Sequence, residues 1–126
     1  MPNLGFDAFR SLPELGNLGK FGPYTSDAAL GSEIQRLLAK SDVPVFCFTI
    51  TVEAHGPWLK GRLTDEQVAE TLGDLDYESF SPPVQMYLCH LRRMDAFLGM
   101  LGHMPVSREV LVWAYGDHPP SLNWNA

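Results

Sequence analysis

VPVFCFTITV, residues 43–52, is the stretch that decides which fold class the sequence predicts. Its β-branched and aromatic residues follow one another without alternating polar positions, which is typical of a strand buried on both faces. A second run of this kind, EVLVWAY at residues 109–115, follows a long helical pattern that begins near Ser81 and ends at Pro105. Strand, helix and strand in this order predict a crossover unit with parallel strands in an α/β fold.

Two shorter helices are predicted from their capping residues. Ser26 or Asp27 can cap a helix whose apolar residues then recur at helical spacing. Thr64 and Gln67 form a capping-box pattern for a second helix of about eight residues. The segment before Ser26 is rich in Gly, Pro and Asn and has no sustained period. It predicts irregular structure with one short helical turn.

The composition limits the classes of protein to which this chain can belong. The chain has 126 residues, 9 Lys and Arg against 15 Asp and Glu, and a net charge of −6. The acidic balance and the absence of basic clusters argue against a nucleic-acid-binding role. No apolar run approaches the roughly 20 residues that span a bilayer, and no signal peptide is visible. Cys47 and Cys89 lack the spacing of a disulfide framework, and Cys47 is interpreted as a small core residue.

Candidate functional residues follow both predicted strands. Parallel strands bring their carboxyl ends to one edge of a sheet, where ligands bind in open α/β folds. His55 follows the first strand, and Asp117 with His118 follows the second. Gly116 permits a bend there, so that both side chains of the Asp-His pair can face one ion. A carboxylate beside an imidazole suits Mn²⁺, Zn²⁺ or Fe better than Ca²⁺. The alternative is a turn Asp that bonds its own backbone beside an exposed His.

His55 and Trp58 near the end of the first strand, and His90 on the long helix, each allow a prediction. His55 is a candidate hydrogen-bond donor to an anionic substrate, or else an exposed loop histidine. Trp58 either lines the same site or packs under the loop. His90 is expected on the surface of the long helix.

Several strings together resemble a known family. TVEAHGPW (51–58) resembles the T-x-E-x-H-x-P-aromatic signature of the sulfatase-like branch of the alkaline phosphatase superfamily, which includes lipoteichoic acid synthases and phosphoglycerol transferases. MYLCHLRRMDAFLGML (86–101) is similar to a helix of that branch, and VLVWAYGDHPPSL (110–122) to its strand closed by Gly-Asp-His. A Gly-Phe-Asp at 5–7 and a Ser-Asp at 26–27 fit its earlier landmarks. The resemblance covers most of the chain in the right order.

The resemblance implies an α/β fold with a sulfatase-like sheet flanked by helices and a metal site at the strand ends. It implies that Asp117 and His118 bind a divalent metal ion (Mn²⁺, Zn²⁺ or Ca²⁺). His55 would contact the phosphate or sulfate group that is transferred. The implied reaction is displacement at phosphorus or sulfur by a metal-activated Thr or Ser, or by formylglycine in true sulfatases. The family's nucleophile motif lies upstream of these strings, and no Thr or Ser of this chain matches it.

These observations combine into one prediction for residues 1–126. They form a single partial domain, the C-terminal portion of a metal-dependent sulfatase- or phosphatase-like hydrolase or phosphoglycerol transferase. Its substrates are phosphate or sulfate esters, and the family suggests cell-envelope or polysaccharide metabolism outside the cytoplasmic membrane. The isolated chain is expected to be inactive, and exposed sheet edges would favour pairing between copies. Two alternatives stay open: a non-catalytic binding module derived from that fold, and a small hydrolase that uses His55, Glu53 and Asp117 without a covalent step.

Overall fold

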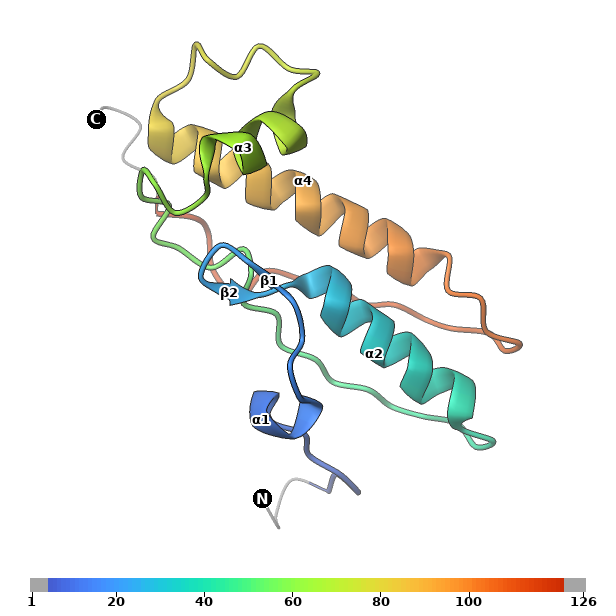
Figure 1. The fold of residues 1–126 in the computed structure, drawn as a ribbon. Coiled ribbons are helices and arrows are strands. Elements are labelled where there is room, and N and C mark those ends of the chain that lie inside the picture. The colour runs from blue at the N-terminus through green and yellow to red at the C-terminus, as the bar shows by residue number, and fades with distance from the viewer. Residues whose placement is uncertain (1–4, 122–126) are drawn as a thin grey trace.

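The computed structural model describes residues 5–121 of the chain (Figure 1). Its elements follow in the order α1 (Leu12–Leu15), β1 (Lys20–Phe21), β2 (Tyr24–Thr25), α2 (Asp27–Lys40), α3 (Asp65–Leu72) and α4 (Pro82–Gly102). The helix α4 is the centre of the arrangement, because both α2 and α3 pack against it. Within residues 5–121, no helix combines the length and the apolar character needed to cross a membrane.

The three longer helices confirm the predictions made from local sequence signals. Ser26 is the N-cap of α2, and Pro82 occupies the first turn of α4, where its missing N–H costs nothing. The predicted capping box of α3 is complete. The Gln67 N–H donates to Thr64 Oγ1 at 3.1 Å, and the Thr64 N–H donates to Gln67 Oε1 at 3.0 Å. These bonds satisfy two backbone donors that the helix itself leaves free.

A short antiparallel hairpin, β1–β2, lies where irregular structure was predicted. Its pairs are Lys20 with Thr25 and Phe21 with Tyr24. The turn passes through Gly22 at φ +59°, in the left-handed region that favours glycine. A Cβ at this glycine would lie 3.0 Å from Leu63 Cδ2, so the turn also needs a residue without a side chain. Two-residue strands are too short to produce a periodic signal in the sequence.

The hydrophobic core lies between α3, the first half of α4, the hairpin and the loop that follows residue 53. Its buried members are Phe21, Trp58, Leu63, Val68, Leu72, Met86 and Cys89. The second half of α4 packs against α2 at Gly31, where an added Cβ would meet the side chains of Met100 and Phe97. The glycine therefore allows the two helices to approach closely.

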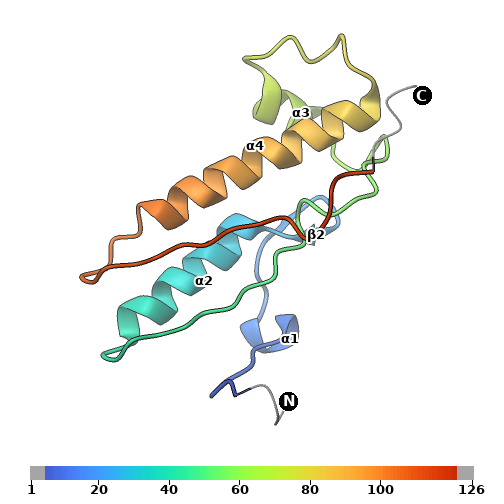
Figure 2. The same ribbon diagram turned by 180° about the vertical axis from the view of Figure 1, so that it is seen from behind.

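The two predicted strands are extended but form no ladder among residues 5–121. Figure 1 and Figure 2 show residues 43–52 and 109–116 running side by side in the same direction, beside α2. The guanidinium of Arg108 joins their beginnings by donating to the carbonyls of Ser41 and Val43. The parallel crossover itself stays a prediction, because the described residues show only the antiparallel hairpin.

Exposure alternates along both extended segments. Phe46 is 79% exposed and its neighbour Val45 38%, while Trp113 is 84% exposed and Val112 39%. A period of two is what an extended segment with one better-covered face produces. Cys47 is exposed as well, so its interpretation as a core residue is wrong. Apolar side chains of both segments thus face outward in this part of the chain.

Candidate functional site

The ends of the two extended segments meet at a pair of histidines. The rings of His55 and His118 lie 6.0 Å apart between centroids, at an interplanar angle of 88°. Both side chains are exposed. The structure therefore brings together the candidate residues that follow the first and the second extended segment, although no ladder joins the segments themselves.

Asp117 and His118 present two adjacent ligand atoms. Asp117 Oδ1 lies 3.6 Å from His118 Nε2. The other ring nitrogen of His118, Nδ1, lies 3.0 Å from the carbonyl oxygen of Pro119. Because a carbonyl oxygen only accepts, Nδ1 carries the proton of this hydrogen bond, and Nε2 is the ring nitrogen left to face a ligand. Two ligands of one tetrahedral ion with bonds of about 2.1 Å lie roughly 3.4 Å apart, close to the observed separation.

The ring of His55 makes the same kind of hydrogen bond as the ring of His118. Its Nδ1 lies 2.7 Å from the carbonyl oxygen of Gly56, the next residue in the chain, which leaves Nε2 free. Ligating histidines in metal sites characteristically donate their second ring N–H to such an acceptor. Residues 5–121 contain no group of three or more His, Cys, Asp or Glu side chains close enough to hold one metal ion. The described residues thus fit part of a metal site, with Asp117 and His118 adjacent and His55 beside them.

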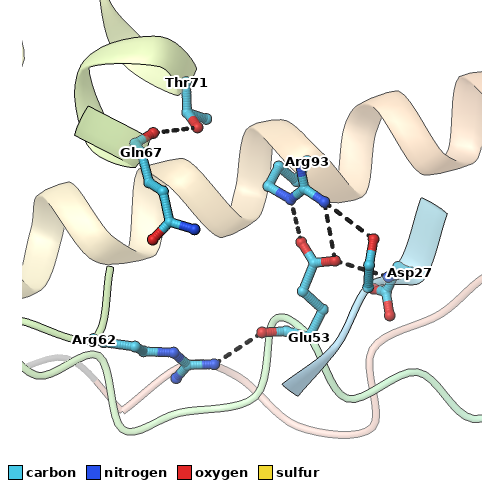
Figure 3. A network of polar contacts seen from close by, with 7 residues as sticks. Asp27, Glu53, Arg62, Gln67, Thr71 and Arg93 are labelled. Carbon is cyan, nitrogen blue, oxygen red and sulfur yellow. Dashed lines mark hydrogen bonds and ion pairs between the residues drawn. The ribbon is translucent and has the colours of Figure 1, made fainter. Parts of the chain in front are cut away.

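A buried carboxylate anchors the loop that carries His55. The side chain of Glu53 is only 2% exposed, and Arg93 Nε of α4 donates to its Oε1 at 2.5 Å. The backbone N–H of Asp27, at the start of α2, donates to Glu53 Oε2 at 2.7 Å. Arg93 Nη2 also reaches Glu53 Oε2, at 3.3 Å, and Ser26 Oγ, at 3.2 Å. Figure 3 shows Glu53 between Arg93 of α4 and Asp27, the first residue of α2.

Arg62 holds the same loop from its other side. Its guanidinium donates to the carbonyl oxygens of Glu53 at 2.8 Å, His55 at 2.5 Å and Pro57 at 3.0 Å, the first of which is drawn in Figure 3. The ring of Tyr24 lies against it, 4.9 Å from the guanidinium carbon to the ring centroid. Burial lowers the pKa of Arg62 from its usual value. Sequence reasoning assigned no role to either Arg62 or Arg93. An acid directly after an apolar run was the available signal, because a buried carboxylate needs a partner.

The structure places Trp58 in the core beneath the loop. The indole ring is 8% exposed and packs edge-on against Tyr87, with centroids 5.1 Å apart. Its six-membered ring also lies close to Gly56. Of the two roles considered for Trp58, packing under the loop is the one these contacts describe, and contact with substrate stays a prediction.

The expectation that His90 lies on the helix surface is wrong. The side chain is 1% exposed, and both ring nitrogens lack a hydrogen-bond partner among the described residues. Its ring packs edge-on against Phe21. The sequence pattern missed this because α4 is covered on more than one side, whereas the predicted apolar stripe assumed a single buried face.

Comparisons with known proteins agree with the motifs. The Sulfatase family model matches residues 1–126. A Rhizobium meliloti (strain 1021) protein named for the modification of cyclic beta-1,2-glucan is 32% identical over 121 residues, covering 94% of this chain and 19% of that protein. The capsular polysaccharide biosynthesis protein RkpI of the same organism is 33% identical over 132 residues, covering 97% of this chain and 21% of RkpI.

The chain thus spans about one fifth of the length of the curated relatives it matches. No solved structure matches it. The family match extends over every residue of the sequence, and it includes the T-x-E-x-H-x-P and Gly-Asp-His strings whose side chains the structure brings together. The chain belongs to the sulfatase family.

Proposed function

We propose that this chain forms the C-terminal part of a catalytic domain that hydrolyses or transfers phosphate or sulfate ester groups. The observation that carries the proposal is the arrangement of Asp117, His118 and His55, with two potential ligand atoms 3.6 Å apart and a second imidazole beside them. The names of the two relatives refer to glucan modification and capsular polysaccharide biosynthesis. They favour an envelope polysaccharide as the class of substrate.

Asp117 and His118 would hold a divalent metal ion, either Mn²⁺, Zn²⁺ or Ca²⁺. The orientation of His118 supports this role, because its Nδ1–H is already engaged by Pro119 and its Nε2 faces the carboxylate. A bound divalent ion would lower the pKa of a hydroxyl nucleophile and offset charge on the transferred group. Durable sites use three or four protein ligands. The remaining ligands would then come from the part of the domain that lies outside this chain.

His55 would bind the group that is transferred. Its Nδ1 is engaged by Gly56, so Nε2 is the nitrogen that can reach an oxygen of a phosphate or sulfate ester. The nucleophile would also come from outside the chain, because no Thr or Ser here matches the family's motif. Alone, the 126 residues would bind ligands weakly and turn nothing over.

Paramagnetic broadening by Mn²⁺ tests the metal site even where binding is weak. Adding Mn²⁺ to the ¹⁵N-labelled chain should broaden the amide signals around Asp117, His118 and His55 before any others. D117N and H118Q should remove that selectivity, because each deletes one of the two ligands. H103Q is the matched control, since His103 is an exposed histidine at the far end of α4.

Equal broadening in wild type, D117N, H118Q and H103Q would contradict the assignment of Asp117 and His118 as metal ligands. The alternative reading as a non-catalytic module, with no metal at this position, would then be favoured.

A further inference from the structure

Arg62 holds the loop that carries His55 through several hydrogen bonds from one side chain. Its guanidinium donates to three carbonyl oxygens, those of Glu53, His55 and Pro57. The planar guanidinium offers five N–H donors in a rigid fork, so several acceptors can be held in one fixed arrangement. We infer that Arg62 is a positioning residue that sets the tautomer and the orientation of His55.

The guanidinium is itself held in place. The Tyr24 ring of β2 lies 4.9 Å from its carbon, and the backbone N–H of Arg62 donates to the Leu59 carbonyl at 3.1 Å. Leu63, the next residue, is 3% exposed and belongs to the core. The donors of Arg62 are therefore anchored to the hairpin and the core.

The connection from Arg62 to His55 passes through the backbone. The carbonyls of His55 and Pro57 flank that of Gly56, and each peptide unit is planar. With both neighbours bonded to one guanidinium, the Gly56 carbonyl has little freedom to turn. It stays 2.7 Å from His55 Nδ1, which must then be the protonated nitrogen. The lone pair of the neutral ring is thereby left at Nε2.

This inference rests on the proposed function only for the use that a free Nε2 would have in binding substrate. The tautomer of His55 can be measured without metal, substrate or activity. The two proposals therefore fail separately. Loss of Mn²⁺ selectivity concerns Asp117 and His118, whereas the ring protonation pattern concerns Arg62 and His55.

The test is a long-range ¹H–¹⁵N spectrum of the histidine rings, recorded at a pH where they are neutral. Wild type should show His55 predominantly with its proton on Nδ1. R62M removes every side-chain donor while keeping an apolar stem, and it should shift the ring toward the Nε2–H form that unconstrained histidines favour. R62K keeps the charge but not the fork, so its tautomer population should lie between the two.

R108M is the matched control. Arg108 also donates to backbone carbonyls, those of Ser41 and Val43, but at the opposite end of the same extended segment. A merely structural loss should affect both arginine variants alike, whereas only R62M should change the tautomer of His55. Should R62M fail to fold, R62L takes its place with the same shift required, since leucine also lacks a side-chain donor.

Three results would overturn the inference. The first is a wild-type His55 that carries its proton on Nε2. The second is an unchanged His55 tautomer in the folded Arg62 variant. The third is an equal shift in R108M.

Discussion

Asp27 and His90 are buried ionisable side chains whose pKa values are displaced in opposite directions. Burial, reinforced by the nearby Glu53 carboxylate, raises the pKa of Asp27 from 3.8 to about 6. Burial, reinforced by the positive charges of Arg62 and Arg93, lowers the pKa of His90 from 6.5 to about 4. In both cases the low-polarity surroundings favour the neutral form.

The two shifts act on stability with opposite signs in the same pH window. Between pH 3.8 and about 6, the folded state binds the Asp27 proton more strongly than the unfolded state does, so acidification stabilises the fold. Between pH 6.5 and about 4, only the unfolded state protonates His90, so acidification destabilises the fold. Each effect can reach about 3 kcal/mol, and the two largely cancel in wild type.

Removing one of these groups should reveal the effect of the other. D27N should lose stability more steeply than wild type as the pH falls through this window, because only the His90 effect remains. H90L should lose less stability or gain some, because only the Asp27 effect remains. Urea unfolding at a series of pH values measures how the free energy of unfolding changes with pH in each variant. The double variant D27N/H90L should show neither effect. Parallel profiles for wild type and both single variants would show that the shifts are absent.

At the scale of the element, α4 carries two adjacent arginines in contrasting surroundings. Arg92 forms an ion pair with Asp74 in which the two side chains are 45% and 63% exposed. Arg93, 29% exposed, pairs with Glu53, whose side chain is only 2% exposed, and the Arg93 guanidinium carbon lies 3.8 Å from the centroid of the Phe21 ring. Exposed pairs contribute about 0–1 kcal/mol, whereas removing one partner of a buried pair costs about 3–5 kcal/mol.

R93M should therefore lower the free energy of unfolding by about 3–5 kcal/mol, because it leaves the Glu53 carboxylate buried without its charge partner. R92M, at the neighbouring position of the same helix, should change it by less than about 1 kcal/mol. Chemical denaturation of both variants measures the difference. R93M/E53Q should recover part of the loss, since it leaves no unpaired charge. Similar values for R92M and R93M would contradict the role of Arg93 in joining α4 to the His55 loop.

The helices were predictable because their signals are local. The caps of α2 and α3, the proline at the start of α4 and the spacing of apolar residues all act within a few positions. The hairpin was not predictable, because each strand has two residues and its turn depends on contact with Leu63, far along the chain. The role of Arg93 was not predictable for the same reason, because its partner Glu53 lies 40 residues away in the sequence.

At the scale of the whole molecule, the two extended segments expose apolar side chains on one face. Phe48, Ile50, Leu111 and Trp113 are all exposed. The relatives are about five times longer than the chain, which aligns with 19% and 21% of their lengths. We propose that a longer polypeptide supplies neighbouring strands to residues 43–52 and 109–116. This would provide backbone partners for both segments and bury their outer face.

Thiol reactivity tests this proposal through Cys47, which lies exposed in the middle of the first segment. In the 126-residue chain, Cys47 should react readily with a disulfide reagent such as DTNB. Cys89 should not react until unfolding, since it is buried and its pKa is raised to about 11 by burial. In a polypeptide that also carries the remainder of the domain, Cys47 should react at least about tenfold more slowly.

C47S assigns the fast-reacting thiol. An equally fast Cys47 in the longer polypeptide would contradict the proposed cover. Protection that appears in the short chain as its concentration rises would instead indicate pairing between copies.

The sequence by itself determined the three longer helices, the family and the types of residue at the ends of the two apolar runs. These properties follow from periodicity, capping and short strings, which depend only on near neighbours. The tertiary structure decided which side chains meet: the rings of His55 and His118, the buried pair of Glu53 with Arg93, and the contacts of Arg62 with the loop carbonyls. Such contacts depend on how α4 packs against the rest of the chain. Whether the extended segments pair as strands depends on a neighbouring backbone, which no pattern within either segment can specify.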